Sequence, residues 1–100
     1  MIKPNALIKK TELGELILGR KGGETTIKII DKLLVRPYNM NQLARVLNME
    51  YNTITHHMKM MHKHKFVFKG EGNYGSLYYP SPKLIKNLNN FEQIKKYAKI

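Results

Sequence analysis

The stretch Asn41–Lys65 reads NQLARVLNMEYNTITHHMKMMHKHK, and its apolar residues recur at the spacing of two short amphipathic helices. A tight turn around Asn48 and Met49 separates the two helices, and the second helix is the more polar and basic on its outer face. We therefore expect the chain to be organised around a helix-turn-helix unit.

A short apolar helix is expected before this unit, near the N-terminus. Leu13, Leu16 and Ile17 stand at positions i, i+3 and i+4, a stripe too large to remain in water on so short a helix. We expect the stripe to pack on the body of the domain or on a second subunit. Residues 19–23, GRKGG, then break the helix and form a basic, flexible joint.

A longer helix, from Glu24 to Arg36, leads into the helix-turn-helix unit. Its apolar residues recur at helical spacing, and Pro37 ends it because proline forces the preceding residue out of the α region. Residues 38–40 are expected to form a short edge strand. Asn41 is then well placed as the N-cap of the first helix of the unit.

The residues after the unit predict a β-hairpin and a C-terminal helix. Strands at 66–68 and 76–79 flank a turn at 69–75. Ser81 is expected to cap a helix that has Pro82 at its first position and that leaves an apolar stripe uncovered by the compact domain. The residues expected to form a dimer interface are Leu13, Leu16, Ile17, Leu84, Leu88, Phe91 and Ile94.

This order of elements predicts a winged helix-turn-helix in the α+β class, mainly α, with dimerisation helices at both ends. The predicted division is an N-terminal arm or helix with the basic glycine joint at 1–23, the winged helix-turn-helix DNA-binding domain at 24–80 and a C-terminal dimerisation helix at 81–100. A homodimer is expected, since a chain of 100 residues has only a modest core of its own.

The composition narrows the classes of partner. Lys and Arg number 18 and Asp and Glu number 7, and the net charge of +11 favours a polyanion such as nucleic acid or an acidic membrane. The chain has no cysteine, which excludes disulfides and thiolate metal sites. Neither a transmembrane span nor a signal peptide is expected, so the sequence predicts a cytoplasmic protein with no membrane partner.

The outer face of the helix predicted at 51–64 suits the major groove of DNA, which is about 12 Å wide and admits a helix. Asn52 can offer a bidentate pair of hydrogen bonds to adenine, and His56 and Lys59 can reach guanine acceptors. The other polar residues of this helix are expected to contact phosphates: Tyr51, Thr53, Thr55 and Lys63. Thr55 can alternatively bond to a base edge.

The hairpin at 66–79 is expected to act as a wing beside this helix. Lys69 and Asn73 would lie against the backbone or the minor groove of the flanking DNA. A helix face of Lys and Thr is on its own more often a solvated face. A capped helix before it, a glycine-tipped hairpin after it and the charge of +11 together favour double-stranded DNA as the partner.

No metal, cofactor or catalytic site is expected. The histidines, His56, His57, His62 and His64, include no pair at i and i+4, the spacing of a helical zinc site, and His57 is expected to be a packed or capping residue. Residues 70–75 match G-x-G-x-x-G, but a strand follows them where a nucleotide site needs a helix. Acidic residues are scattered without a pair, so we expect no enzyme.

The stretch Gly19–Tyr79 resembles the winged-helix repressors of the arsenical-resistance-repressor (ArsR-like) superfamily, in the type common in archaea. Within it, PYNMNQLARVLNMEYNTITHHMKMM is similar to that branch's pattern of proline, asparagine, leucine-alanine and tyrosine-x-threonine-x-x-histidine-histidine. The resemblance implies a dimeric transcription regulator that pairs through its terminal helices. Metal sensors of the family carry cysteine pairs, or Asp and His ligands on the last helix. This chain has no cysteine and only Glu92 within 81–100, so metal sensing is not implied.

Two other classes of function stay open. The excess of lysine also suits an architectural protein that coats DNA without regard to sequence, because phosphate neutralisation alone gives micromolar, salt-labile binding. A winged helix can also serve as a protein-interaction module, in which the stripe from Leu84 to Ala98 would bind a partner helix.

Overall fold

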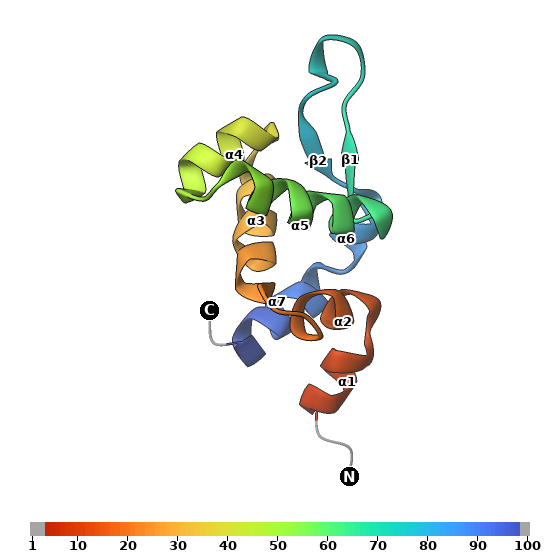
Figure 1. The fold of residues 1–100 in the computed structure, drawn as a ribbon. Coiled ribbons are helices and arrows are strands. Elements are labelled where there is room, and N and C mark those ends of the chain that lie inside the picture. The colour runs from red at the N-terminus through yellow and green to blue at the C-terminus, as the bar shows by residue number, and fades with distance from the viewer. Residues whose placement is uncertain (1–3, 99–100) are drawn as a thin grey trace.

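The computed structural model describes residues 4–98, with side chains from Leu7 onward, and the start of the arm predicted at 1–23 lies outside this part of the chain. The described residues form seven α-helices and one two-stranded sheet, which confirms the α+β, mainly α class (Figure 1). In chain order the elements are α1 (Pro4–Lys10), α2 (Glu12–Leu18), α3 (Gly23–Val35), α4 (Met40–Leu47), α5 (Tyr51–Lys63), β1 (Val67–Lys69), the 3-10 turn η1 (Gly72–Tyr74), β2 (Tyr78–Pro80), α6 (Pro82–Lys86) and α7 (Leu88–Ala98).

The molecule is elongated, with principal extents of 51 × 26 × 21 Å. The β1–β2 hairpin projects at one end and α1 lies at the other, with α4 and α5 nearer the hairpin and α2 and α7 nearer α1 (Figure 1). One hydrophobic core joins these parts, and α3 contributes Ile27, Ile29 and Ile30, which are fully buried. α2 packs on both α3 and α7, so the terminal segments share the core with the segment between them.

The apolar stripes predicted to be left for a second subunit are covered within the single chain. The prediction of an uncovered C-terminal stripe is therefore wrong, because α2 packs along α7 and fills the space beside it. The N-terminal stripe packs on the body of the domain, which was one of its two expected positions. Of the predicted dimer residues, Leu88 is half-buried and the others are at most 5% exposed: Leu13, Leu16, Ile17, Leu84, Phe91 and Ile94.

Each terminal segment contains two helices where one was expected. The side chain of Thr11 caps α2 by accepting a hydrogen bond from the Gly14 amide at 2.9 Å. A Cβ at position 14 would overlap the carbonyl oxygen of Ile8, so only glycine permits the close approach of α1 and α2. Near the C-terminus, Asn87 separates α6 from α7, and its Nδ2 donates to the carbonyl oxygen of Lys83 at 2.8 Å.

The N-cap of α4 is Asn39, and the prediction of Asn41 at this position is wrong. The side chain of Asn39 accepts a hydrogen bond from the Gln42 amide at 2.7 Å, and the Gln42 side chain accepts one from the Asn39 amide at 2.9 Å. This reciprocal capping box needs Gln or Glu three residues after the cap, which selects Asn39. The helix therefore begins at Met40, and the expected strand at 38–40 is reduced to a single bridge between Tyr38 and Tyr78.

The turn between α4 and α5 lies where the sequence placed it. Asn48 adopts the left-handed conformation, with φ 54° and ψ 50°, and the Met49 amide donates to the carbonyl oxygen of Ala44 at 2.9 Å. The hairpin that follows α5 is antiparallel, with Phe68 opposite Tyr79 and Lys69 opposite Tyr78. Its turn contains η1, with Gly72 at φ 57°.

Candidate nucleic-acid interface

One face of α5 is buried and the opposite face is fully open to solvent. Ile54, Met58 and Met61 have no exposed surface, because they point into the hydrophobic core. Side chains three or four residues apart share a face of a helix, so the polar residues between them form a continuous stripe. We call this stripe the recognition face, and its four exposed residues are Asn52, His56, Lys59 and Lys63.

The two threonines predicted to contact DNA lie off this stripe. Thr53 is exposed on its shoulder. Thr55 is half-buried, and its hydroxyl donates a hydrogen bond to the sulfur of Met40 at 3.2 Å. This contact turns Thr55 toward the start of α4 and away from the residues of the recognition face.

A recess of about 180 Å³ opens beside the start of α5 and joins three elements that are distant in the sequence. It brings together Tyr51 of α5 and Lys69 of β1, which the sequence predicted separately as phosphate contacts. Asn41 and Ser76 also line it and were missed: Asn41 was assigned to the helix cap, and Ser76 needs the hairpin register to be placed. We call it the hairpin recess, and its lining is Asn39, Met40, Asn41, Tyr51, Lys69, Ser76 and Tyr78.

The hairpin presents polar and aromatic side chains beyond this recess. Asn73 is exposed at the turn, and Tyr74 next to it is 61% exposed, a residue that sequence reasoning did not select. The Lys69 ammonium lies 5.7 Å from the centroid of the Tyr78 ring, and Phe68 stacks on Tyr79 at 5.3 Å. The first contact places Lys69 beside Tyr78, which also lines the recess.

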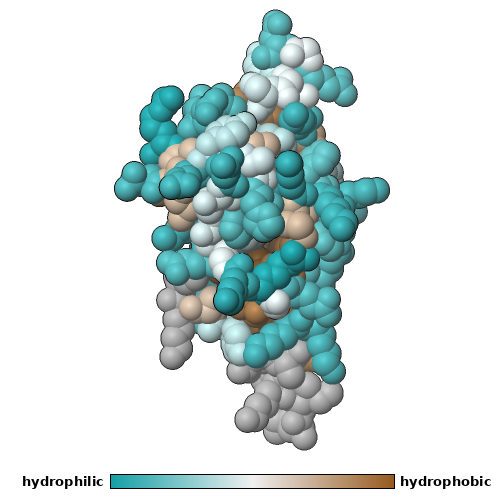
Figure 2. All heavy atoms as spheres, viewed as in Figure 1, coloured by the Kyte–Doolittle hydropathy of each residue, from teal (hydrophilic) through white to brown (hydrophobic). Residues whose placement is uncertain are grey.

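The face of the molecule that carries α5 is mostly hydrophilic, and hydrophobic atoms are visible over a smaller area near its middle (Figure 2). Among the described residues, the ion pairs lie on other side chains and include none of Lys59, Lys63 and Lys69. No carboxylate of the described residues pairs with these three lysines, an arrangement that suits an anionic partner. The pairs that do form join Glu24 to Lys28, Asp31 and Glu92 to Lys95, and Glu12 to both Lys83 and His64.

The histidines of α5 occupy different environments. His56 is exposed on the recognition face, whereas His57 is half-buried and its Nδ1 lies 3.0 Å from the hydroxyl of Thr26 on α3. Burial lowers the pKa of His57 below its ordinary value of 6.5, and the neighbouring His56 adds to this effect. His57 is thus a packing residue, one of the two roles expected for it, and its lowered pKa favours the neutral ring. The His62 ring lies at 89° to the Tyr78 ring, with the two centroids 6.4 Å apart.

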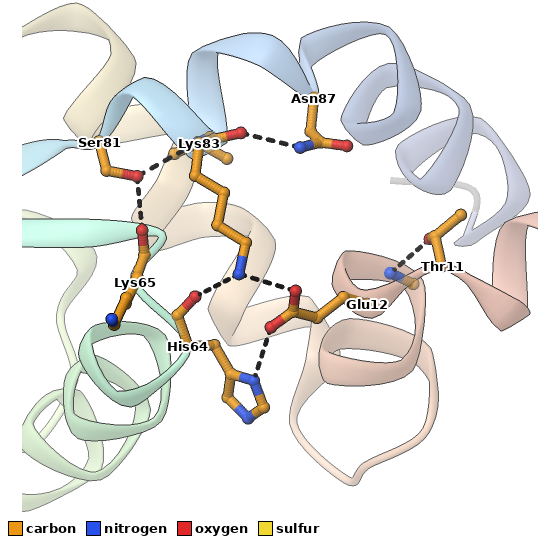
Figure 3. Close-up of polar contacts among 9 residues, drawn as sticks. Thr11, Glu12, His64, Lys65, Ser81, Lys83 and Asn87 are labelled. Atoms are coloured by element: carbon orange, nitrogen blue, oxygen red, sulfur yellow. Dashed lines mark hydrogen bonds and ion pairs between the residues drawn. The ribbon is translucent and has the colours of Figure 1, made fainter.

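A group of polar contacts fixes the end of α5 against the terminal helices (Figure 3). Glu12 of α2 pairs with the Lys83 ammonium at 2.7 Å and with His64 Nδ1 at 3.0 Å. The hydrogen bond from Lys83, and next that from His64, hold the pKa of Glu12 below its ordinary 4.5. Ser81, which caps α6 as predicted, donates to the carbonyl oxygen of Lys65 at 2.6 Å. We call Glu12, His64 and Lys83 the clasp.

No family model matches the chain, and no curated protein matches it either. Within residues 4–98, no three His, Cys, Asp or Glu side chains come close enough together to share a metal ion. In the same part of the chain, no helix is long and apolar enough to cross a membrane.

Proposed function

We propose that the chain binds double-stranded DNA as a winged helix-turn-helix protein, with α5 in the major groove and the β1–β2 hairpin as its wing. The observation that carries this proposal is the recognition face, which is polar, cationic and uncovered along the whole of α5. A solvated face needs no neighbouring recess or wing. Here the hairpin recess lies beside the start of α5, where a flanking phosphate would fall.

The dimensions of α5 suit this role. Its 13 residues extend about 20 Å at 1.5 Å per residue. From Asn52 to Lys63 the recognition face covers about 16 Å, which corresponds to about five base pairs at 3.4 Å each. Asn52 and His56 would contact base edges, and Lys59 and Lys63 would contact guanine acceptors or phosphates.

The hairpin recess supplies the positioning contact. Lys69 offers a charge, Tyr51 and Ser76 offer hydroxyl donors, and Asn41 offers an amide donor. A backbone phosphate seated there would be held by α4, α5 and the wing at once, which would fix the rotation of α5 in the groove.

The further proposal, that the chain is a transcription regulator of the ArsR-like type, rests on the sequence resemblance of Gly19–Tyr79 together with this arrangement of helices and hairpin. The homodimer stays a prediction. It needs a surface other than the terminal stripes, since these are filled within one chain. An inverted-repeat operator would accompany such a dimer, because each recognition helix reads one half-site.

Selection of bound duplexes from a random pool, followed by competition with random duplex, tests the proposal. A sequence-specific reader should prefer the selected site by about 10³-fold or more. Asn52→Ala should weaken the selected site by about 1 to 3 kcal/mol and relax one base position. Lys69→Ala should weaken all duplexes alike and reduce the salt slope by about one. The exposed Lys96 on α7 provides a control variant of equal charge, Lys96→Ala, which should change neither preference nor register.

One observation favours the alternative, an architectural DNA-binding protein. Because Thr55 turns toward Met40, Asn52 and His56 are the two residues of the recognition face other than lysine that are suited to hydrogen-bond discrimination. A preference below about tenfold for the selected site, with Asn52→Ala equal to wild type, would establish this alternative and contradict sequence-specific reading.

A further inference from the structure

A second recess borders α5 and shares no lining residue with the hairpin recess. Its volume is about 250 Å³, and it opens between α5, the end of α2 and the glycine joint that leads into α3. We call it the joint recess. Its lining is Leu16, Arg20, Lys21, Thr26, His56, His57, Met60 and Met61.

The joint recess combines an apolar floor with a cationic rim. The partly exposed Met60 and the 5% exposed Leu16 supply the apolar surface, and Met61 lies behind them with no exposed surface. Arg20 and Lys21 are exposed at the rim, and neither forms an ion pair within residues 4–98. A recess with this lining matches a ligand that has both an apolar body and a negative charge.

The wall of the joint recess is held by close packing. His57 is fixed by its contact with Thr26, and a Cβ at position 22 would lie 2.9 Å from His57 Cε1. Gly22 also has φ 82°, a conformation that other residues rarely adopt. The glycine joint therefore lies directly against the imidazole, and Arg20 and Lys21 stay close to α5 because the chain between them and α3 is short.

We propose that the joint recess binds a small organic anion, with its carboxylate against Arg20 and Lys21 and its apolar part against Met60 and the exposed edge of Leu16. A volume of about 250 Å³ lies just below the roughly 300–1,000 Å³ of drug-sized ligand pockets, so the ligand is metabolite-sized. A bare phosphate of the DNA backbone would use the rim and leave the apolar floor without a function.

The position of His56 gives this site a consequence for DNA binding. His56 lines the joint recess and is also a member of the recognition face. An anion in the recess would bind Arg20 and Lys21 and would contact the His56 ring. Its negative charge would repel a nearby DNA phosphate. Occupancy therefore lowers DNA affinity, an effect that rests on the proposed function, whereas binding of the anion does not.

The binding test uses the full chain without DNA. Benzoate is the probe, and its arrival is followed by isotope-edited NMR of the amides of residues 20–23 and of the His57 ring. We expect saturable binding with a Kd of about 1 mM or lower. Benzyl alcohol, which lacks the charge, and inorganic phosphate, which lacks the apolar part, should both bind more weakly. The double variant R20Q/K21Q should weaken benzoate by about fivefold to tenfold, as two exposed charge contacts would.

Lys96→Gln is the matched control and should bind benzoate as wild type does. No saturation by about 10 mM benzoate, equal binding by phosphate, or wild-type binding by R20Q/K21Q would each overturn the proposal. Equal binding by phosphate would identify the recess as a seat for the DNA backbone instead. Saturating benzoate should weaken the selected duplex by about fivefold or more, and unchanged DNA affinity would overturn the regulatory effect. If the chain without benzoate did not bind DNA, this result would contradict the proposed function but not the anion site.

Discussion

Replacing Phe91 by alanine tests whether the terminal helices belong to the folded unit of a single chain. Phe91 lies on α7, is 0% exposed and belongs to the core shared by α2, α3 and α7. Phe→Ala substitutions at buried sites cost about 3–5 kcal/mol, because the lost transfer free energy adds to the cost of the cavity. The ring also carries the Lys95 ammonium 5.4 Å from its centroid, so a weaker cation–π contact is lost with it.

This cost is a large part of the total free energy of unfolding, which is about 5–15 kcal/mol for a domain. With a urea m-value of about 1.5 kcal/mol/M, the midpoint of Phe91→Ala should fall by about 2 to 3 M. Ile85→Ala is the matched control, since Ile85 lies on the neighbouring α6 and is 48% exposed. Its free energy of unfolding should change by less than about 0.5 kcal/mol.

Circular dichroism during urea denaturation, at two protein concentrations tenfold apart, measures both effects. The midpoints of wild type and of Phe91→Ala should not depend on concentration if the stripe is filled within one chain. Equal losses of unfolding free energy in Phe91→Ala and Ile85→Ala would contradict the burial of the α7 stripe within one chain. A wild-type midpoint that rises with protein concentration, with no such rise in Phe91→Ala, would contradict it too.

Three further predictions concern the N-cap of α4, the loss of stability at low pH and the close approach of α1 and α2. Asn39→Ala should destabilise the fold by about 1 kcal/mol in thermal unfolding, whereas Asn41→Ala should not, because only Asn39 caps α4; the reverse order would restore the cap to Asn41. The free energy of unfolding should fall as the pH drops below 6.5, because the pKa of His57 is lower in the folded chain and the unfolded chain therefore binds the proton more tightly. It should fall again below pH 4.5, as the Glu12 carboxylate of the clasp is protonated. Urea midpoints from pH 7.5 downward measure both steps, and His57→Gln should reduce the first; an equal first step in that variant would contradict the assignment. Gly14→Ala should lower the melting temperature markedly, although alanine is the better helix former, and a raised melting temperature would contradict the close approach at Ile8.

The central part of the fold follows from local rules that the sequence displays. The left-handed Asn48, the apolar stripe of α5 and the Ser81–Pro82 start of α6 depend on neighbouring residues only. The cap of α4 could also have been predicted from the sequence, because Gln42 stands three residues after Asn39 and six residues before the turn. This capping-box pattern identifies Asn39, and not Asn41, as the N-cap.

The remaining features depend on contacts between distant residues. The burial of the C-terminal stripe requires α2 to lie along α7, where Asn90 donates to the Thr11 hydroxyl at 3.0 Å across most of the chain length. The direction of Thr55 depends on the position of Met40, and the hairpin recess depends on the register that places Ser76 near Tyr51. Periodicity identifies the faces of helices but does not say which other element will cover them.

Methylation interference on the selected duplex tests the central claim, that α5 reads DNA in the major groove, most directly. Guanine N7 lies in the major groove and adenine N3 in the minor groove, so the two methylated positions report on different grooves. We expect N7 methylation to block binding within one run of about five base pairs per chain. In Lys59→Ala, methylation at one of these guanines should no longer affect binding. Binding that tolerates N7 methylation throughout the site and is blocked only by N3 methylation would contradict the claim.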